Sequence, residues 1–277
     1  MSGPSTIELV RRPPPPALAG VVSGIAGYRE GARGPTVQHE SAALVVPLIV
    51  SLGSAFEIAF GRAPTTADAR PSFLAGLHPG AVEIRSDGGA ECLQIDFTPL
   101  GAHRFFGGLA GEIASRLVPV EDALGAAGRA LRERLGNAAT WDERFALAEA
   151  FLAERTLGAP RPEIAQLCAA MARSGGRVAV GAIAADLGIS RKHLADLCGR
   201  HLGIGPKTLG RIIRFRRACA MAGGAGAPWA GVAAACGFAD QPHLVREFQA
   251  LAGTTPSGWL RRLGRGEEGL RPDEAAG

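Results

Sequence analysis

Hydrogen-bond donors gather at the starts of two short segments in the last third of this 277-residue chain. Arginine and lysine can donate to the guanine acceptors of the DNA major groove, and glutamine can form two hydrogen bonds with adenine. The pattern therefore predicts that both segments contact DNA, by reading base edges or by binding phosphate. The candidate residues are Ser190, Arg191, Lys192 and Arg200 in the first segment, Lys207 just after it, and Gln241, His243 and Arg246 in the second.

Each donor cluster follows a run of small apolar residues and a glycine, Gly188 in the first case and Gly237 in the second. Alanines let two helices pack closely at a sharp angle, and a glycine between them tolerates a positive φ. Ser190 is expected to cap the helix that carries the first cluster. We therefore predict two helix-turn-helix units, over residues 178–201 and 229–250.

The two units in this order resemble the DNA-binding domain of AraC/XylS-type transcription regulators over Pro162–Leu263. The resemblance implies seven helices, one of them a long helix over Pro206–Ala222 that bridges two sub-domains. Each sub-domain would offer a recognition helix to major-groove segments about one helical turn, roughly 34 Å, apart. The resemblance is also compatible with a contact with RNA polymerase. The residues that carry the resemblance are Arg217–Ala222, Gly237, Phe238, Gln241, Leu244, Arg246, Phe248 and Gly253–Pro256.

Asp196 departs from the family pattern, because members commonly carry a hydrogen-bond donor near this position. A carboxylate that faces DNA repels phosphate unless it accepts from a cytosine amine or pairs with a neighbouring arginine. Two interpretations stay open: a base contact, or a role in fixing Arg191 or Arg200. In the second unit Asp240 is the expected N-cap.

Charge is divided unevenly along the chain. Residues 175–265 contain 13 Lys and Arg but 4 Asp and Glu, a net charge of +9, whereas the whole chain carries +4 and the remainder therefore −5. A basic module joined to a mildly acidic one indicates phosphate binding at one end only. The expected partner is double-stranded DNA.

The region before the basic module has the pattern of short strands, in Ala43–Leu52, Phe56–Phe60, Val82–Arg85 and Cys92–Phe97. Strands without intervening helices favour an antiparallel sandwich or barrel. The predicted fold class is therefore α+β, and the resemblance implies a cupin-like sensor domain. If a small-molecule effector binds inside it, His78 and Arg85 are guesses for its contacts.

Four helices are predicted after the strands, over Leu100–Phe106, Glu112–Leu117, Asp122–Leu135 and Trp141–Leu157. The helical hairpin they form is expected to pack on the barrel or to pair with a second protomer. The predicted domains are a flexible arm over residues 1–17, the sensor domain over 18–158, the DNA-binding domain over 162–263 and a disordered tail over 264–277.

Nothing in the sequence predicts a cofactor or a metal. His39, His78 and His103 lack the closely spaced ligand pattern of a metal-binding cupin enzyme, and the five cysteines lack the spacing of a zinc site or a disulfide framework. We therefore predict a cytoplasmic DNA-binding regulator without a membrane segment and without enzyme activity. The alternatives are a dimeric regulator that needs no effector and a cupin enzyme fused to a DNA-binding module.

Overall fold

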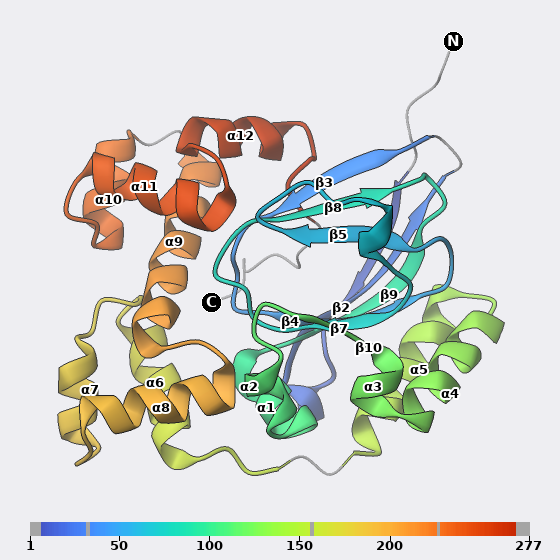
Figure 1. Ribbon diagram of the computed structural model, residues 1–277, viewed down its shortest axis with the longest axis horizontal. Helices are drawn as coiled ribbons and strands as arrows, with labels where there is room; N and C mark the ends of the chain where they lie inside the picture. The colour runs from blue at the N-terminus through green and yellow to red at the C-terminus, as the bar shows by residue number, and fades with distance from the viewer. Residues whose placement is uncertain (1–6, 32–33, 156–157, 226–227, 270–277) are drawn as a thin grey trace.

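The computed structural model describes residues 7–31, 34–155, 158–225 and 228–269, which form an N-terminal barrel and a C-terminal helical domain (Figure 1). The strands are β1 (Ile7–Arg12), β2 (Val22–Glu30), β3 (Thr36–Glu40), β4 (Val46–Ser51), β5 (Phe56–Phe60), β6 (Ala69–Arg70), β7 (Phe73–Ala75), β8 (Val82–Ser86), β9 (Glu91–Phe97) and β10 (Leu117–Pro119). They form one sheet in the order β1-β2-β9-β4-β7-β10 and a second in the order β3-β8-β5-β6. The pairings within both sheets are antiparallel, which confirms the predicted α+β class with an N-terminal sandwich.

The two faces of the larger sheet have different neighbours. In β9, Leu93 and Ile95 are completely buried in the main core, while Cys92 and Gln94 line a cavity between the sheets. Alternate residues of a strand point to opposite faces, so one strand serves both environments. This explains the continuous apolar run of β4, which reads in the sequence as a fully buried strand.

Two segments predicted to be disordered contain ordered structure. Residues Ile7–Arg12 were expected in a flexible arm but pair with β2 over their whole length, and residues 1–6 lie outside the described part of the chain. In the predicted tail, Glu267–Gly269 lie beside β3, because the N–H of His39 donates to the Glu267 carbonyl at 2.8 Å and the N–H of Gly269 donates to the His39 carbonyl at 2.7 Å. The rest of that tail, residues 270–277, is not described.

The helices that follow the barrel differ in their bounds from those that the sequence predicts. They are α1 (Pro99–Phe106), α2 (Leu109–Glu112), α3 (Val120–Leu124), α4 (Ala126–Asn137) and α5 (Trp141–Ala153). The predicted helix over Glu112–Leu117 is wrong beyond its first residue, because Ser115 has a φ of 54° and Leu117 pairs with Ala75 of β7. The predicted helix over Asp122–Leu135 is interrupted at Gly125, where φ is 61°.

The C-terminal domain contains α6 (Pro162–Arg173), α7 (Val180–Asp186), α8 (Arg191–Leu202), α9 (Pro206–Ala225), α10 (Trp229–Cys236), α11 (Gln241–Ala252) and α12 (Pro256–Gly264). These seven helices of the described chain match the predicted number, and α9 extends three residues past the predicted end of the bridging helix. Figure 1 shows α9 running between α6–α8 on one side and α10–α12 on the other. None of the described helices is long and apolar enough to cross a membrane.

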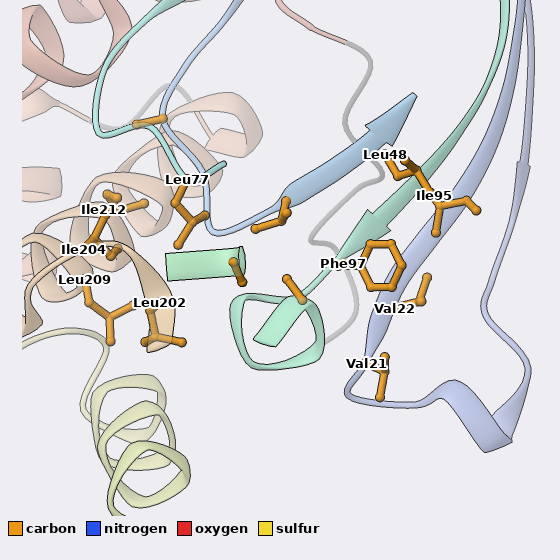
Figure 2. Packing of buried hydrophobic residues seen from close by; sticks show 14 of the residues in the cluster. Val21, Val22, Leu48, Leu77, Ile95, Phe97, Leu202, Ile204, Leu209 and Ile212 are labelled. Atoms are coloured by element: carbon orange, nitrogen blue, oxygen red, sulfur yellow. The ribbon is translucent and has the colours of Figure 1, made fainter. Parts of the chain in front are cut away.

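One hydrophobic core continues from the barrel into the helical domain. Figure 2 shows this cluster extending from Ile95 and Phe97 of the sheet, past Leu77, to Leu209 and Ile212 of α9. The two parts of the chain are therefore packed against each other rather than merely tethered by the linker.

The C-terminal end of α8 lies against α1 and α2 of the sensor domain. A methyl group on Gly111 of α2 would come within 1.9 Å of the Arg200 carbonyl oxygen, so the main chains are nearly in contact. His103 of α1 and His201 of α8 meet in the same contact, with 2.9 Å between His103 Nε2 and His201 Nδ1. Burial lowers the pKa of both imidazoles, and for His201 the charges of His103 and Arg161 contribute further.

Candidate nucleic-acid interface

The first helix-turn-helix unit is formed by α7 and α8, and its turn has the geometry that the sequence predicts. Gly188 has a φ of 66°, a conformation that side chains other than glycine rarely adopt. Ser190 Oγ accepts a hydrogen bond from the N–H of His193 at 3.1 Å, which confirms Ser190 as the N-cap of α8. Leu194 and Leu197 are completely buried. The cap and these two side chains together fix which face of α8 points outward.

The outward face of α8 places its candidate residues at opposite ends of the helix. Arg191 and Lys192 are exposed in the first turn, and the N-terminal part of a recognition helix is the part that reaches base edges. Arg200 is exposed in the last turn, next to the contact with α2, and its Nε donates to the Asp196 carbonyl oxygen at 3.4 Å. Arg200 thus contacts the main chain of Asp196 and not its carboxylate, which is exposed on the same face as Lys192.

The second unit, α10 and α11, repeats this arrangement. Gly237 has a φ of 78°, and Asp240 Oδ1 accepts from the N–H of His243 at 2.6 Å, which confirms Asp240 as the N-cap. Gln241 and Arg246 are exposed on α11. Neither side chain packs in the core, so both can reach a groove of DNA.

The ring of His243 is held by contacts within its own unit. Its Nδ1 accepts from the N–H of Ala239 at 3.3 Å, and its ring packs edge-on against Phe238 with 5.5 Å between ring centroids. Its other nitrogen, Nε2, lies 3.8 Å from Glu247 Oε1. These contacts hold the His243 ring at the start of α11, and the sequence did not predict them.

An aromatic cluster joins the second unit to the bridging helix. Phe248 of α11 is completely buried, and its ring centroid lies 4.9 Å from that of Phe215 on α9, 5.5 Å from Trp229 and 6.0 Å from Trp259. Edge-on aromatic pairs at such distances stabilise a core beyond their buried area. Trp259 of α12 packs inward in this cluster and is 5% exposed.

Two arginines of α9 bind internal acceptors, and sequence reasoning did not identify their partners. Arg211 Nε donates to both carboxylate oxygens of Glu247, at 3.0 and 3.1 Å, and so connects α9 to α11. Arg214 Nη1 donates to the Gly176 carbonyl at 2.7 Å and connects α9 to the loop before α7. The signal for Glu247 was available in the sequence, because it is an acidic residue flanked by Leu244 and Phe248 on the apolar side of α11.

A basic groove of about 840 Å³ lies between the start of α7, the start of α8 and α9. None of its described lining residues is acidic. A concave surface with one sign of charge concentrates the electrostatic potential that attracts phosphate. Lys207 lies in this groove beside Arg191 and Lys192, which supports its selection as a DNA contact. The six cationic lining residues are Arg177, Arg191, Lys192, Lys207, Arg211 and Arg214.

In the sensor domain, the two residues guessed as effector contacts have different positions. His78 lines the cavity between the sheets, whereas Arg85 is not one of the residues that line it. Ile84 points into the cavity, so the alternation of β8 turns Arg85 outward, where its guanidinium pairs with Glu83 at 2.8 Å. The prediction that Arg85 contacts an effector inside the cavity is therefore wrong. Within the described residues, no three His, Cys, Asp or Glu side chains are grouped as metal ligands.

One comparison with known proteins agrees with the helical geometry. A family model described as a helix-turn-helix domain matches residues 183–262. Comparison with curated proteins gave no match. Among solved structures, an AraC-type transcriptional regulator from Chromobacterium violaceum is 22% identical, with a TM-score of 0.34, and the match covers 36% of this chain and 91% of that one. An apo form of a ToxT variant from Vibrio cholerae is 10% identical, with a TM-score of 0.48, and the match covers 86% of this chain and 96% of that one.

The match to the family model spans both units that the geometry identifies, from Ile183 in α7 to Arg262 in α12. It includes both N-caps, Ser190 and Asp240, and the whole of the bridging helix. The chain therefore contains, over residues 183–262, a helix-turn-helix domain, a motif that many proteins use to place a helix in the major groove of DNA.

Proposed function

We propose that this protein is a sequence-specific transcription regulator, and not an enzyme, in which residues 162–263 read DNA and residues 18–158 bind a small-molecule effector. The observation that carries the proposal is the pair of capped recognition helices, α8 and α11, held by one continuous helix, α9. Both helices present exposed donors near their N-terminal ends, and both are fixed to α9 by buried side chains. One chain can then contact two successive major-groove segments on one face of the duplex.

The donors divide between two tasks. Arg191, Lys192 and Gln241 lie in the first turns and are proposed to contact base edges, where arginine selects guanine and glutamine selects adenine. Arg246 lies one to two turns further along α11 and is proposed to contact phosphate or an adjacent base. Lys207, in the basic groove, supplies a phosphate contact that does not depend on sequence.

The effector part of the proposal is supported by a connection between the cavity and the second unit. Ser41 and Ala42 line the cavity at the end of β3, and the N–H of Ala42 donates to the carbonyl of Leu251, near the C-terminal end of α11, at 2.7 Å. Ser41 Oγ donates to Glu268, in the segment beside β3. A ligand that moves this wall would therefore shift α11 relative to the barrel, and allosteric couplings of this kind amount to about 1–3 kcal/mol.

We also propose that the protein forms a homodimer through the exposed side of α4 and α5 and contacts RNA polymerase when bound at a promoter. The hairpin of α4 and α5 packs on the larger sheet by one face only, with Leu131, Leu135 and Phe145 buried. Its outward face is available to a second protomer. Light scattering after size-exclusion chromatography measures the mass: a monomer at micromolar concentration contradicts this part.

The experiment that tests DNA recognition is selection of genomic fragments by the purified protein at a fixed salt concentration, repeated with Arg246→Ala and Arg116→Ala. Arg116 is an exposed arginine between α2 and β10 in the sensor domain, so its variant removes the same charge away from the first turns of the recognition helices and from the α4–α5 hairpin. We expect one asymmetric motif spanning two adjacent major-groove segments, with affinity reduced about 10- to 100-fold in Arg246→Ala and unchanged in Arg116→Ala. Uniform binding to all fragments, or equal losses in both variants, would show a basic surface without sequence recognition.

A further inference from the structure

The cavity between the two sheets of the barrel has mostly apolar walls. Its volume is about 80 Å³, several times the roughly 10–15 Å³ that one water molecule needs on a similar scale. Phe56, Ile58 and Phe73 line it and are at most 9% exposed, in a cluster separate from the main core. A cavity of this size and lining fits the body of a small molecule of about one ring.

The cavity wall offers no positive charge to a ligand. None of the described residues that line it is lysine or arginine, and Glu40 is the carboxylate side chain among them. His78 packs on Phe60 with 4.4 Å between ring centroids, and its Nδ1 lies 2.9 Å from Ser115 Oγ. Burial lowers the pKa of His78, so its ring is neutral at pH 7. An anionic ligand would lose its hydration here without meeting a counter-charge.

Two hydrogen-bond donors of the wall, on Gln94 and Tyr28, are held by carboxylates. Gln94 Nε2 donates to Asp96 Oδ1 at 2.8 Å, and Tyr28 Oη donates to Glu30 Oε1 at 2.6 Å. Burial and the contact with Glu30 raise the pKa of Tyr28, so the phenol stays protonated. Because the amino group of Gln94 is held by a carboxylate, its amide oxygen remains able to accept from a ligand.

We infer that the effector is an uncharged small molecule with an apolar body of about one ring and a hydroxyl or N–H that donates to the cavity wall. This inference depends on the proposed function only in that the ligand regulates DNA binding. The chemistry of the cavity itself is independent of DNA binding. It excludes small carboxylic acids and phosphate esters as ligands of this cavity.

The single tyrosine of the chain, Tyr28, lines the cavity, so its ring gives one unambiguous signal at the site. The full-length protein is labelled with ¹³C-tyrosine and titrated with p-cresol, toluene and 4-methylbenzoate, three probes with the same methylated ring. We expect p-cresol to shift the Tyr28 ring signals in a saturable manner. Toluene, which lacks the donor, should bind about 3- to 10-fold more weakly, and 4-methylbenzoate at least about 100-fold more weakly.

Ala75→Phe is the variant that tests the location, because Ala75 is 8% exposed and lines the cavity. It should remove p-cresol binding, measured by calorimetry, while Val37→Phe, which adds similar bulk at a position that is 43% exposed and outside the cavity, should not. If Ala75→Phe fails to fold, the Tyr28 titration of the unaltered protein still decides. Binding of 4-methylbenzoate as tight as p-cresol, or no shift of Tyr28 by p-cresol, overturns the inference. Fragment selection by the same preparation tests the proposed function separately, so either conclusion can fail alone.

Discussion

The contact between Arg211 and Glu247 should determine the orientation of the second recognition helix relative to α9. Glu247 is 9% exposed, and both of its carboxylate oxygens accept from Arg211 Nε. In Glu247→Gln the side chain keeps its size but loses its charge. Hydrogen bonds to charged groups contribute about 1.5–3 kcal/mol. The guanidinium side chain is 37% exposed, so water compensates part of the loss, and we expect the free energy of unfolding to fall by about 1–2 kcal/mol.

The effect on DNA binding separates a structural role from simple charge repulsion. If Glu247 acted only as a negative charge close to DNA, its removal would tighten binding at low salt. If it holds α11 on α9, its removal should weaken binding to the selected motif several-fold and leave binding to unrelated DNA nearly unchanged. Urea unfolding and fluorescence anisotropy with both DNAs measure the two quantities.

The matched control is Asp196→Asn, which removes an exposed carboxylate from the face of α8 that carries Lys192. Its stability should change by less than about 0.5 kcal/mol, as for most surface substitutions, and its DNA binding should tighten because phosphate repulsion is removed. Unchanged stability together with tighter binding in Glu247→Gln would refute the structural role. A double-mutant cycle with Arg211→Gln then measures the coupling between the two residues directly.

Three further predictions concern packing, the domain contact and pH. Phe248→Ala should lower the free energy of unfolding by about 3–5 kcal/mol, measured by urea titration, since its ring is completely buried among aromatic neighbours. Gly111→Ala should loosen the contact between α2 and α8, because the added methyl group would collide with the Arg200 carbonyl, and it should speed proteolysis between the domains. Gly136→Ala should have neither effect, because nothing lies within 4 Å of its added methyl group. His103 and His201 have lowered pKa values when folded. Their contribution to stability is therefore complete above pH 6.5, the usual value, and is lost as pH falls through the folded pKa values. Urea midpoints at pH 7.5 and 5.5 should differ less in the His103→Asn/His201→Asn variant.

The sequence predicted the features that depend on local chemistry. Ser190 and Asp240 were identified as caps because an N-cap side-chain oxygen accepts from the N–H three residues later in the chain. The interaction is therefore local and does not depend on a distant partner. Gly188 and Gly237 were identified because a sharp turn between helices needs a positive φ. The same local reasoning, applied to the alternation of β8, would have turned Arg85 away from the cavity once Ile84 was placed inside.

Features that depend on distant contacts were not predicted. Leu117 has a helical neighbourhood in the sequence, but pairing with Ala75 places it in a strand. Glu268 was expected in a disordered tail, yet it accepts from Ser41, 227 positions earlier in the chain. Pairing energy of this kind outweighs local propensity, and nothing in a single sequence reports it.

The two recognition helices are attached to the sensor domain through the same end. The last turn of α8 lies against α2, and the last turn of α11 binds the cavity wall through Leu251. Their first turns, with Arg191 and Gln241, are exposed. A change in the barrel would therefore reach both helices at the ends opposite the first turns that we propose to contact DNA. Because α8 contacts the helical layer and α11 contacts the cavity wall, a ligand would move α11 more than α8. Regulation in this chain should then act on the spacing between the two contacted DNA segments rather than on either segment alone.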